Sequence, residues 1–480
     1  MVHIKSVFMK QLPRSLPLVA AALLAWHQPV TAQAALQAEP APTDCPDCNP
    51  PKRFWAGAGE LMVVQLIPYS VSRYLRDAEW AKISFKSWSD NLKYPWQWDN
   101  NKFLNNQFSH PYHGSLYFNA GRANGYNFWE STPWAFGGSL MWELFGEVWA
   151  PSPNDLANTT LGGITLGEML WRFSSLVLDN QATGSERTWR EISAAVINPV
   201  RGFNRLVRGE AGRISETPPD WRPTTIQAAM DVGYRHLTSD LTGGGESSSD
   251  QVFLRFTGIY GDPFRDLAKS PFSTFQFAGT LASRSENSRN LQELSVRGNL
   301  AARPLSSNSE STLLVGFMTY EYLSNPVLDF GAQGFQGGLV HRSSKENVTF
   351  TGEALARFNP IAAVRSDYFV SAEGRDYDYG IGLGGKLVGS AVWRGRGLAQ
   401  VNGGYVFLPV VSGFPGQHHI WVLGAEARGY LGNGKFGFGA AFNRVWRHSR
   451  YTFNPNVDED LTEFRLYGSL TLPRWEQPQP

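Results

Sequence analysis

In the second half of the chain, apolar and polar side chains alternate residue by residue, and this period of two constrains the fold more than any other feature. In the last such segment, apolar or small residues from Phe464 to Leu472 alternate with Glu463, Arg465, Tyr467, Ser469 and Thr471. Successive side chains of a β-strand point to opposite faces of its sheet. Each segment is therefore predicted to be a strand with one apolar and one polar face.

About twelve segments of this kind lie between Thr224 and Trp475. They begin near residues 224, 251, 271, 291, 311, 328, 346, 376, 397, 419, 435 and 461. This spacing is wider than the roughly 8–12 residues typical of soluble sandwiches, and it suits membrane strands of about ten residues with their turns. The predicted fold of residues 224–475 is a membrane β-barrel of about twelve antiparallel strands, with a short tail at 476–480.

Charges of both signs recur on the polar faces of these strands. A soluble sandwich would turn them outward, whereas a membrane barrel turns its apolar face to lipid and its polar face to the lumen. We predict a barrel whose lumen charges pair with one another. They are Asp231, Arg235, Arg255, Glu293, Arg297, Glu353, Arg357, Asp378, Lys386, Glu426, Arg428, Glu463 and Arg465.

The N-terminus predicts export. Lys5, Lys10 and Arg14 precede an apolar run at 16–26, and small residues at 32–34 supply a cleavage pattern. Residues 1–34 are therefore predicted to be a signal peptide, with an uncleaved membrane anchor as the alternative. Export and a barrel together predict the outer membrane of a Gram-negative bacterium.

Outer-membrane lipid and the barrel-assembly machinery are the partners that this prediction implies. The net charge is only +1, so nothing points to nucleic acid. No cofactor is implied, and the oligomeric state stays open.

A Pro-rich leader at 35–54 contains the only cysteines, Cys45 and Cys48. A C-x-x-C pair can be redox-active or half of a zinc site. A third soft ligand is missing, and an exported chain meets an oxidising compartment. We therefore predict a small local disulfide and no metal site.

Residues 55–197 have a helical period and many tryptophans, and we interpret them as a helical domain. Ser152 fits an N-cap before Pro153, with Asp155 at the third helical position. The pair Gly163 and Gly167 predicts the close approach of another helix. Glu168 and Arg172, four residues apart, predict an ion pair on one helix face.

Residues 198–223 are predicted to be a basic linker between the two domains. Arg201, Arg205 and Arg208 form a basic stripe along it. We interpret this stripe as the solvated face of a linker helix, with contact to phosphate head groups as the alternative.

The candidate catalytic residues are His110, His113, Glu143, Glu147 and Asp155. The histidines and glutamates could bind a metal, or a His–carboxylate dyad could hydrolyse a lipid or glycan. Because Pro111 follows His110, the two histidines need not share a helical turn.

The plainer interpretation of these residues is a polar network inside an aromatic helical unit. The remaining members of that network would be Arg122, Glu130, Glu168 and Arg172.

Three blocks in this region resemble a known family. The stretches "HPYHGSLYFNAGRANGYNFWES", "GSLMWELFGE" and "PSPNDLANTTLGGITLGEMLWR" are similar to the signature blocks of an uncharacterised bacterial family, domain of unknown function 3943. The resemblance covers roughly residues 55–190. It implies a signal peptide and a β-rich C-terminal half, and no activity.

A looser similarity exists to small membrane families of the vancomycin-resistance-Z-like kind. Its members share an early His, a mid-chain Glu and a Ser-x-x-Asp-x-x-Asn helix start. The matching positions here are His110, Glu143 or Glu147, Ser152, Asp155, Asn158 and Gly162.

The whole sequence therefore predicts a helical domain followed by an outer-membrane barrel. We expect the helices to lie at the periplasmic side of the barrel or inside its lumen, as an adaptor or a plug. The expected function is to bind or pass an envelope molecule. The alternative is a membrane-embedded enzyme that acts on lipid or glycan, with His110 and Glu143 as acid and base.

Overall fold

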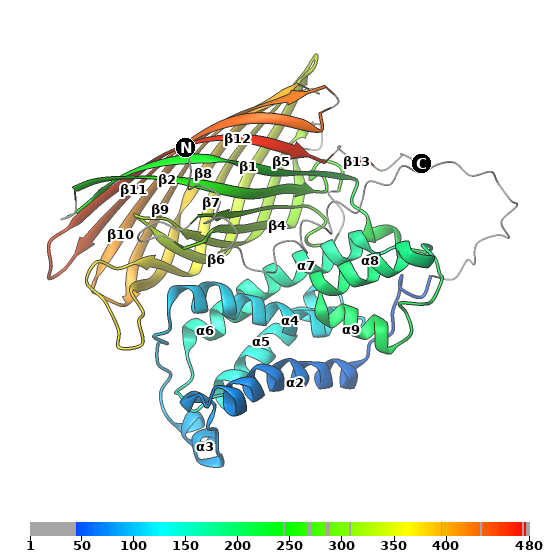
Figure 1. Ribbon diagram of the computed structural model, residues 1–480, viewed down its shortest axis with the longest axis vertical. Coiled ribbons are helices and arrows are strands. Elements are labelled where there is room, and N and C mark those ends of the chain that lie inside the picture. The colour runs from blue at the N-terminus through cyan, green and yellow to red at the C-terminus, as the bar shows by residue number, and fades with distance from the viewer. Residues whose placement is uncertain are drawn as a thin grey trace, which may run out of the picture.

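The computed structural model describes residues 45–242, 245–266, 270–283, 289–306, 309–394, 396–432, 434–472 and 475–476. The predicted signal peptide at 1–34 and nearly all of the predicted tail lie outside the described residues. A helical domain comes first and a barrel follows it (Figure 1).

The helical domain contains eight α-helices among the described residues. They are α2 (Phe54–Ser70), α3 (Phe85–Lys93), α4 (His110–Arg122), α5 (Phe128–Phe145), α6 (Pro153–Ala157), α7 (Gly163–Val177), α8 (Gly184–Ile197) and α9 (Pro199–Val207). The π-helical turns η1 (Val71–Leu75), η3 (Asn105–Ser109) and η4 (Asn158–Gly162), and the 3₁₀ turns η2 (Glu79–Ala81) and η5 (Pro219–Trp221), complete it. Among the described residues, no helix has the length and apolar character that a membrane crossing requires.

Close packing at glycine joins α4 to η4 and α7. A Cβ on Gly114 would lie 1.8 Å from the backbone oxygen of Thr159, and a Cβ on Gly163 would lie 2.5 Å from the backbone of Gly114. A Cβ on Gly167 would meet Phe118 at 2.8 Å. The predicted close approach at Gly163 and Gly167 is confirmed.

Twelve long antiparallel strands close into a barrel. They are β1 (Thr225–Leu241), β2 (Gly245–Tyr260), β3 (Phe275–Ala282), β4 (Leu291–Ser306), β5 (Ser309–Ser324), β6 (Asp329–Lys345), β7 (Val348–Arg365), β8 (Tyr377–Trp393), β9 (Gly397–Ser412), β10 (Gly416–Leu431), β11 (Phe436–Tyr451) and β12 (Val457–Thr471). Each strand pairs with the next, and β12 pairs with β1 from Ala229↔Thr471 to Asp240↔Asp460. The predicted twelve-stranded barrel is confirmed.

Four strands, β2, β3, β10 and β12, begin three or more residues from their predicted starts. β2 begins at Gly245 rather than near residue 251, because its first residues are polar and exposed and carry no alternation. Trp475 does not belong to the last long strand. It forms β13 (Trp475–Glu476), which pairs with Thr225 and Ile226 at the start of β1.

Ion pairs between strands that are not neighbours identify the lumen face. Arg255 on β2 contacts Glu426 on β10 at 2.8 Å, and Arg297 on β4 contacts Glu353 on β7 at 2.6 Å. An apolar cluster also crosses the interior. It contains Leu237, Val327, Leu328, Phe330, Ala332, Ala362, Val364, Val406, Leu408, Ile420, Val445 and Leu461. Charged and apolar side chains thus both occupy the lumen.

The opposite face of the strands carries large apolar side chains. Phe350, Phe358, Leu387 and Leu466 are all exposed there. An apolar exterior around a polar interior is the arrangement of a membrane barrel.

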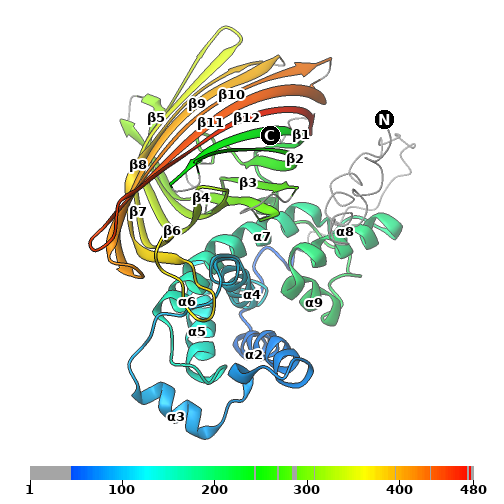
Figure 2. The same cartoon turned by 60° about the vertical axis from the view of Figure 1, so that its left-hand side comes forward.

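The helical domain packs against the outer wall of this barrel. Tyr320 and Tyr322 flank Glu321 on β5, whose carboxylate faces the lumen and bonds Arg357, so the two tyrosines point outward. Tyr322 contacts Phe103 of the helical domain, with ring centroids 5.3 Å apart. Figures 1 and 2 show the helices beside the barrel, with α7 near the wall and α2 and α3 far from it.

The predicted position inside the lumen is therefore wrong, whereas the position at the periplasmic side stays a prediction. An apolar strand face has the same sequence pattern whether lipid or a helix covers it, so the pattern could not identify the covered wall. The predicted solvated linker is also wrong, because it begins with α9, whose Arg201 and Arg205 are buried.

Candidate binding site between the helical domain and the barrel wall

A tyrosine of the barrel wall forms the centre of a buried polar site. The Tyr379 hydroxyl lies 3.2 Å from the amide nitrogen of Gln107, 3.2 Å from that of Asn154 and 3.3 Å from that of Asn158. It also lies 3.4 Å from the hydroxyl of Tyr377. The first three partners come from η3, α6 and η4, so the site joins the helices to β8.

Asp99 and Asn106 extend the site along Tyr377. The Asn106 amide donates to the Tyr377 hydroxyl and to the Asp99 carboxylate, both at 2.8 Å. Asp99 Oδ2 also accepts the backbone N–H of Asn101 at 2.8 Å.

Two π-helical turns supply these amides. η3 runs directly into α4, and η4 runs directly into α7. Single π-helical turns inside α-helices occur frequently at functional sites. Pro111 lies in the first turn of α4, where its missing N–H is tolerated. His110 and His113 therefore share one helical turn, and the expectation that Pro111 could separate them is wrong.

His110 lies beside η4 and α6, the two elements that supply Asn158 and Asn154 to the site. Its Nδ1 lies 3.1 Å from the Thr159 hydroxyl, and its Nε2 lies 3.9 Å from Asp155 Oδ2. Burial lowers the pKa of His110 to about 4, although the charge of Asp99 opposes the shift. The imidazole is therefore neutral near pH 7, with one nitrogen free to accept a proton.

His113 lies apart from the carboxyl groups. Its Nε2 is 3.3 Å from the backbone oxygen of Val64, and its ring packs on Tyr117 and Trp142. Burial lowers its pKa as well. Its contacts are those of a packed core residue.

Three predicted carboxyl groups belong to the site. Glu143 accepts the backbone N–H of Ser152 at 2.8 Å, and burial raises its pKa to about 8. Burial also raises the pKa values of Glu147 and Asp155 well above their ordinary range, and the charges of Asp99 and Glu143 add to the rise.

Capping explains only part of this arrangement. Ser152 is the N-cap of α6, and its hydroxyl accepts the backbone N–H of Asp155 at 3.3 Å, as predicted. In a capping box, the side chain at the third helical position accepts the backbone N–H of the N-cap residue. Here Glu143, and not Asp155, accepts the backbone N–H of Ser152. Asp155 is therefore free of the capping role, and it accepts the Asn154 amide at 2.9 Å.

The site presents hydrogen-bond acceptors that no protein donor among the described residues meets. In the described part of the chain, no Lys or Arg lies within ion-pair distance of Glu143, Glu147 or Asp155. The amide oxygens of Asn106 and Asn158 are buried, and neither has a hydrogen-bond partner among the described residues. Such unpaired acceptors are costly unless a ligand or water supplies donors.

His110 lies where the site meets the surface, because its side chain is 20% exposed and that of Asp155 is 3% exposed. Tyr112, two residues further along the same turn, is also exposed and stacks on Phe108. His110 is therefore the more exposed member of this pair.

The other predicted network members lie elsewhere. Glu168 pairs with Arg122 at 2.8 Å and with Arg172 at 2.9 Å, so the predicted pair of Glu168 and Arg172 is confirmed. Glu130 pairs with Lys52 at 2.5 Å and caps α5. The single network that the sequence predicts is thus three separate ones, because these carboxyl groups leave their helices on different faces.

The predicted lumen charges lie inside the barrel, and most of them form ion pairs. The ion pairs are Arg235–Glu463 (3.1 Å), Arg465–Glu463 (2.8 Å), Arg255–Asp231 (2.9 Å), Arg428–Asp231 (2.9 Å), Arg428–Glu426 (3.1 Å) and Arg357–Glu321. Glu293 accepts the Thr280 hydroxyl at 3.1 Å, and Asp378 lies 3.1 Å from His418 Nε2. Lys386 is half-buried on β8.

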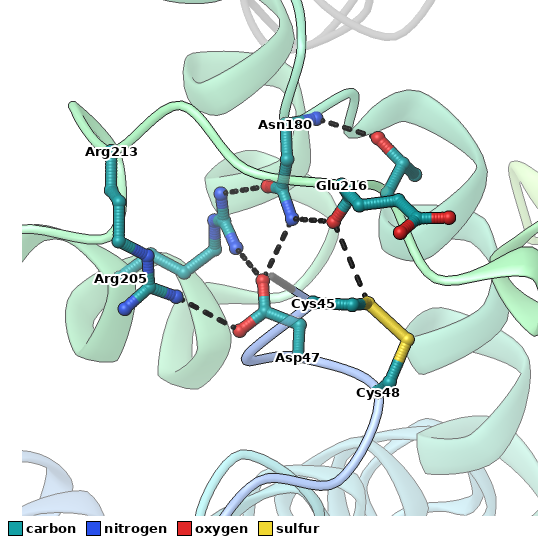
Figure 3. The surroundings of a disulfide bond; sticks show 8 residues. Cys45, Asp47, Cys48, Asn180, Arg205, Arg213 and Glu216 are labelled. Carbon is teal, nitrogen blue, oxygen red and sulfur yellow. Dashed lines mark hydrogen bonds and ion pairs between the residues drawn. A yellow bond between two sulfur atoms is a disulfide. The ribbon is translucent and has the colours of Figure 1, made fainter. Parts of the chain in front are cut away.

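Cys45 and Cys48 are joined by a disulfide, with their sulfurs 2.10 Å apart (Figure 3). Among the described residues, no three His, Cys, Asp or Glu side chains gather in a way that could hold a metal ion.

Solved structures with a similar fold are outer-membrane proteins. An outer membrane channel from Pseudomonas putida F1 is 11% identical, with a TM-score of 0.29 over 52% of this chain and 96% of that chain. The NanC porin is 11% identical, with a TM-score of 0.26 over 51% of this chain and 100% of that chain. An anion-selective porin from Comamonas acidovorans is 9% identical, with a TM-score of 0.23 over 52% of this chain and 98% of that chain. Scores this low carry no argument, so the barrel assignment depends on the strand pairing.

No curated protein matches the chain. Residues 95–200 contain α4 to α8 and most of the polar site. This segment matches the family model described as "Domain of unknown function (DUF3943)", which confirms the family resemblance of the sequence blocks.

Proposed function

We propose that this chain is an outer-membrane β-barrel protein that binds an envelope molecule between its helical domain and its outer wall. The observation that carries the proposal is the acceptor-rich site around Tyr379, which lies outside the lumen. Export through a signal peptide at 1–34, assembly by the barrel-assembly machinery and a surrounding shell of outer-membrane lipid belong to the same proposal. The apolar exterior of the closed barrel supports them.

The contents of the lumen argue against solute passage as the main activity. The pairs Arg255–Glu426 and Arg297–Glu353 reach between strands that are not neighbours. The apolar cluster around Leu237 and Val406 crosses the same interior. A solute would have to break buried ion pairs to pass, and breaking such pairs is costly.

The chemistry of the site selects a class of ligand. Two unpartnered amide oxygens and a neutral imidazole accept hydrogen bonds, and the protonated carboxyl groups accept through their carbonyl oxygens. A ligand that presents several N–H or O–H donors, as an amine or a sugar does, satisfies them. Such groups occur on the head groups of envelope amphiphiles, whose apolar parts suit the surrounding surface.

Mass spectrometry of co-purified molecules tests this proposal. The full-length protein, extracted in mild detergent, should retain an amphiphile that the Asp155→Asn variant loses. Glu186→Gln is the matched control, because Glu186 is an exposed carboxylate on α8, outside the site. Equal retention by both variants would exclude the site. A stable conductance in planar bilayers that Arg255→Ala leaves unchanged would show an open path that the ion pairs do not block.

A second candidate function is acid–base catalysis on a lipid or glycan. The observation that favours it is the opposite direction of two pKa shifts, since the pKa of His110 is about 4 and that of Glu143 is about 8. Near pH 7, the former is an available base and the latter an available acid. The structure brings His110 to Asp155, while Glu143 bonds the backbone of Ser152.

His110→Ala separates the two functions. If the protein is an enzyme, this variant should fail to complement a deletion strain even when its barrel folds. Heat-modifiable migration on a gel reports the folding of the barrel. A folded His110→Ala protein that complements fully would exclude the enzymatic function and would not contradict the binding proposal.

A further inference from the structure

Helix α9 buries its polar face and exposes its apolar face, which is the reverse of the usual arrangement. Arg201, Asn204 and Arg205 are buried, whereas Phe203 is 55% exposed and Leu206 is 72% exposed. A helix on the surface of a water-soluble protein places its apolar stripe inward and its charges outward. The reversed order indicates a surrounding that is apolar.

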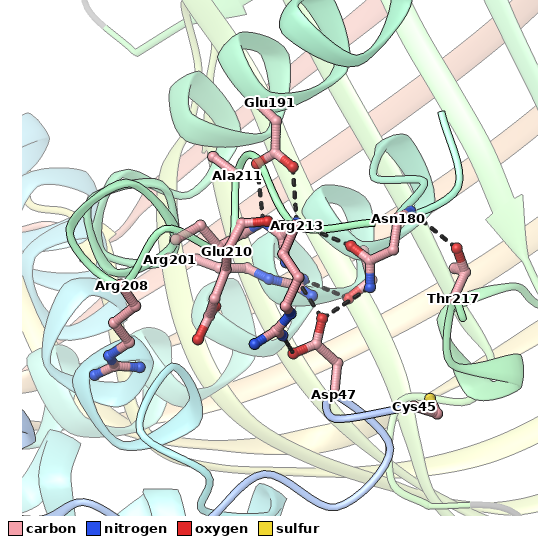
Figure 4. A network of polar contacts seen from close by, with 12 residues as sticks. Cys45, Asp47, Asn180, Glu191, Arg201, Arg208, Glu210, Ala211, Arg213 and Thr217 are labelled. Carbon is pink, nitrogen blue, oxygen red and sulfur yellow. Dashed lines mark hydrogen bonds and ion pairs between the residues drawn. The ribbon is translucent and has the colours of Figure 1, made fainter. Parts of the chain in front are cut away.

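The buried face of α9 belongs to a polar network that its neighbours complete. Arg205 binds Glu191 of α8 at 2.7 and 2.8 Å, Asn180 at 2.9 Å and Asp47 at 3.4 Å. Figure 3 shows Arg205 with Asn180 and Asp47, and Figure 4 shows Glu191, Asn180 and Asp47 of the same network. Asp47 lies in the loop that the disulfide closes, and the Cys45 sulfur lies 3.7 Å from the backbone oxygen of Glu216 (Figure 3). The leader segment thus closes a polar interior.

Arg201 is enclosed in the same interior. Its guanidinium stacks on Trp171 at 4.0 Å and on Trp221 at 4.4 Å. It also donates to the hydroxyls of Ser174 and Ser175 at 2.9 and 2.5 Å. Two arginines of one short helix therefore avoid the surface, although the surface is one residue away.

Helix α2 repeats the reversed order. Its one charged side chain, Glu60, turns inward and accepts the amides of Asn124 and Asn204 at 2.7 and 3.0 Å. Outward, Trp55 is 83% exposed, and Leu66 and Ile67 are exposed as well. Helix α8 adds further exposed apolar side chains, namely Trp189, Ile192 and Val196.

The apolar surface of the helical domain continues the apolar wall of the barrel. Both domains meet through aromatic contacts, such as Phe173 with Phe275 and Phe277 at centroid distances of 5.2 and 4.9 Å. The wall beyond the contact exposes Leu387 and Leu466. Lipid that covers this wall therefore borders the helical domain directly.

We infer that lipid acyl chains cover the outward apolar surface of α2, α8 and α9, so that the helical domain lies in the membrane beside the barrel. Apolar side chains exposed on three helices mark a contact with a membrane or a partner, and the adjoining barrel wall, which faces lipid, favours the membrane. Helices that do not cross a bilayer can still lie within its interfacial layer. The ligand proposed above is not needed for this inference.

Spin labels at single cysteines test the inference in the full-length protein, with its own disulfide intact and reconstituted in phospholipid vesicles. Leu66→Cys and Leu206→Cys report on α2 and α9. Leu387→Cys on the barrel wall is the lipid control, and Lys86→Cys, at a side chain 83% exposed on α3, is the aqueous control. Collisions with oxygen and with a water-soluble nickel complex are measured at each site.

The expected result is that labels at Leu66 and Leu206 match the label at Leu387, with frequent oxygen collisions and loss of nickel collisions. Frequent nickel collisions at both sites, as at Lys86, would place the domain in water and overturn the inference. Protection from both reagents would show a protein partner or a second copy instead of lipid. An aqueous signal at Leu387 itself would refute the membrane barrel, so the two proposals fail separately.

Discussion

Replacing Glu143 by Gln should change how the stability of the protein depends on pH. Glu143 is almost fully buried, and burial raises its pKa from 4.5 to about 8. In the unfolded chain, the same carboxyl ionises near its ordinary pKa. Gln keeps an oxygen for the Ser152 N–H, but it cannot ionise, so the substitution isolates the effect of the charge.

The sign and size follow from linkage. A carboxyl whose pKa is raised by folding contributes its full stability below the unfolded pKa and loses it as pH rises through the folded pKa. Between 4.5 and about 8, this loss is about 1.4 kcal/mol per pH unit, or about 5 kcal/mol in total. The wild-type protein therefore loses this contribution across the window, whereas Glu143→Gln has no such contribution to lose. The raised pKa values of Glu147 and Asp155 lower the stability of both proteins as pH rises, so the comparison isolates Glu143. The lowered pKa of His110 changes the free energy of unfolding only below pH 6.5, and it does so in both proteins.

Urea unfolding followed by tryptophan emission measures the difference near pH 5 and near pH 9. Glu143→Gln should gain several kcal/mol relative to wild type between the two conditions, up to about 5 kcal/mol. Glu186→Gln, an exposed carboxylate on α8, should follow the wild type. A difference between Glu143→Gln and wild type that stays constant with pH would refute the reasoning.

Three further substitutions test the packing. Gly114→Ala should destabilise the helical domain by about 3 kcal/mol or more in thermal melts, because its Cβ would lie 1.8 Å from the backbone oxygen of Thr159. Gly137→Ala is the control and should be neutral or stabilising, because its Cβ would meet nothing within 4 Å. Arg205→Ala removes the shorter ion pair of Glu191 and one of the two arginine partners of Asp47, and leaves Arg187 and Arg213 beside them, so it should cost up to about 3 kcal/mol and speed proteolysis of the helical domain; unchanged proteolysis would contradict this. Tyr379→Phe removes the acceptor of three buried amides and should lower the urea midpoint by an amount equivalent to about 1–3 kcal/mol.

The barrel could be predicted because strand alternation is a local property. Each strand carries its own period of two, and the lumen charges on β12, such as Glu463 and Arg465, follow from that period alone. The place of the helical domain could not be predicted in this way. The outward residues Tyr320 and Tyr377 look like any interfacial aromatic residues, and only the folded structure shows that helices cover them.

The site was predictable in part. His110, Glu143 and Asp155 could be chosen because His and carboxylates are rare on apolar helices. Tyr379 could not, since its partner Asn154 is 225 residues away in the sequence. The one local signal was the pair of tyrosines flanking Asp378 at the start of β8, which places two hydroxyls on one face.

The basic stripe of α9 shows why its interpretation failed. A periodic pattern identifies two faces of a helix, but the surrounding medium decides which face turns inward. If that medium is lipid, no water can satisfy an arginine, and every donor needs a protein acceptor. Arg205 meets this condition, because all three guanidinium nitrogens donate to Glu191, Asp47 or Asn180. Any buried arginine needs such pairing, so the lipid surrounding of the helical domain is inferred from the outward apolar side chains of α9, Phe203 and Leu206, and the pairing explains only how the opposite face tolerates its charges.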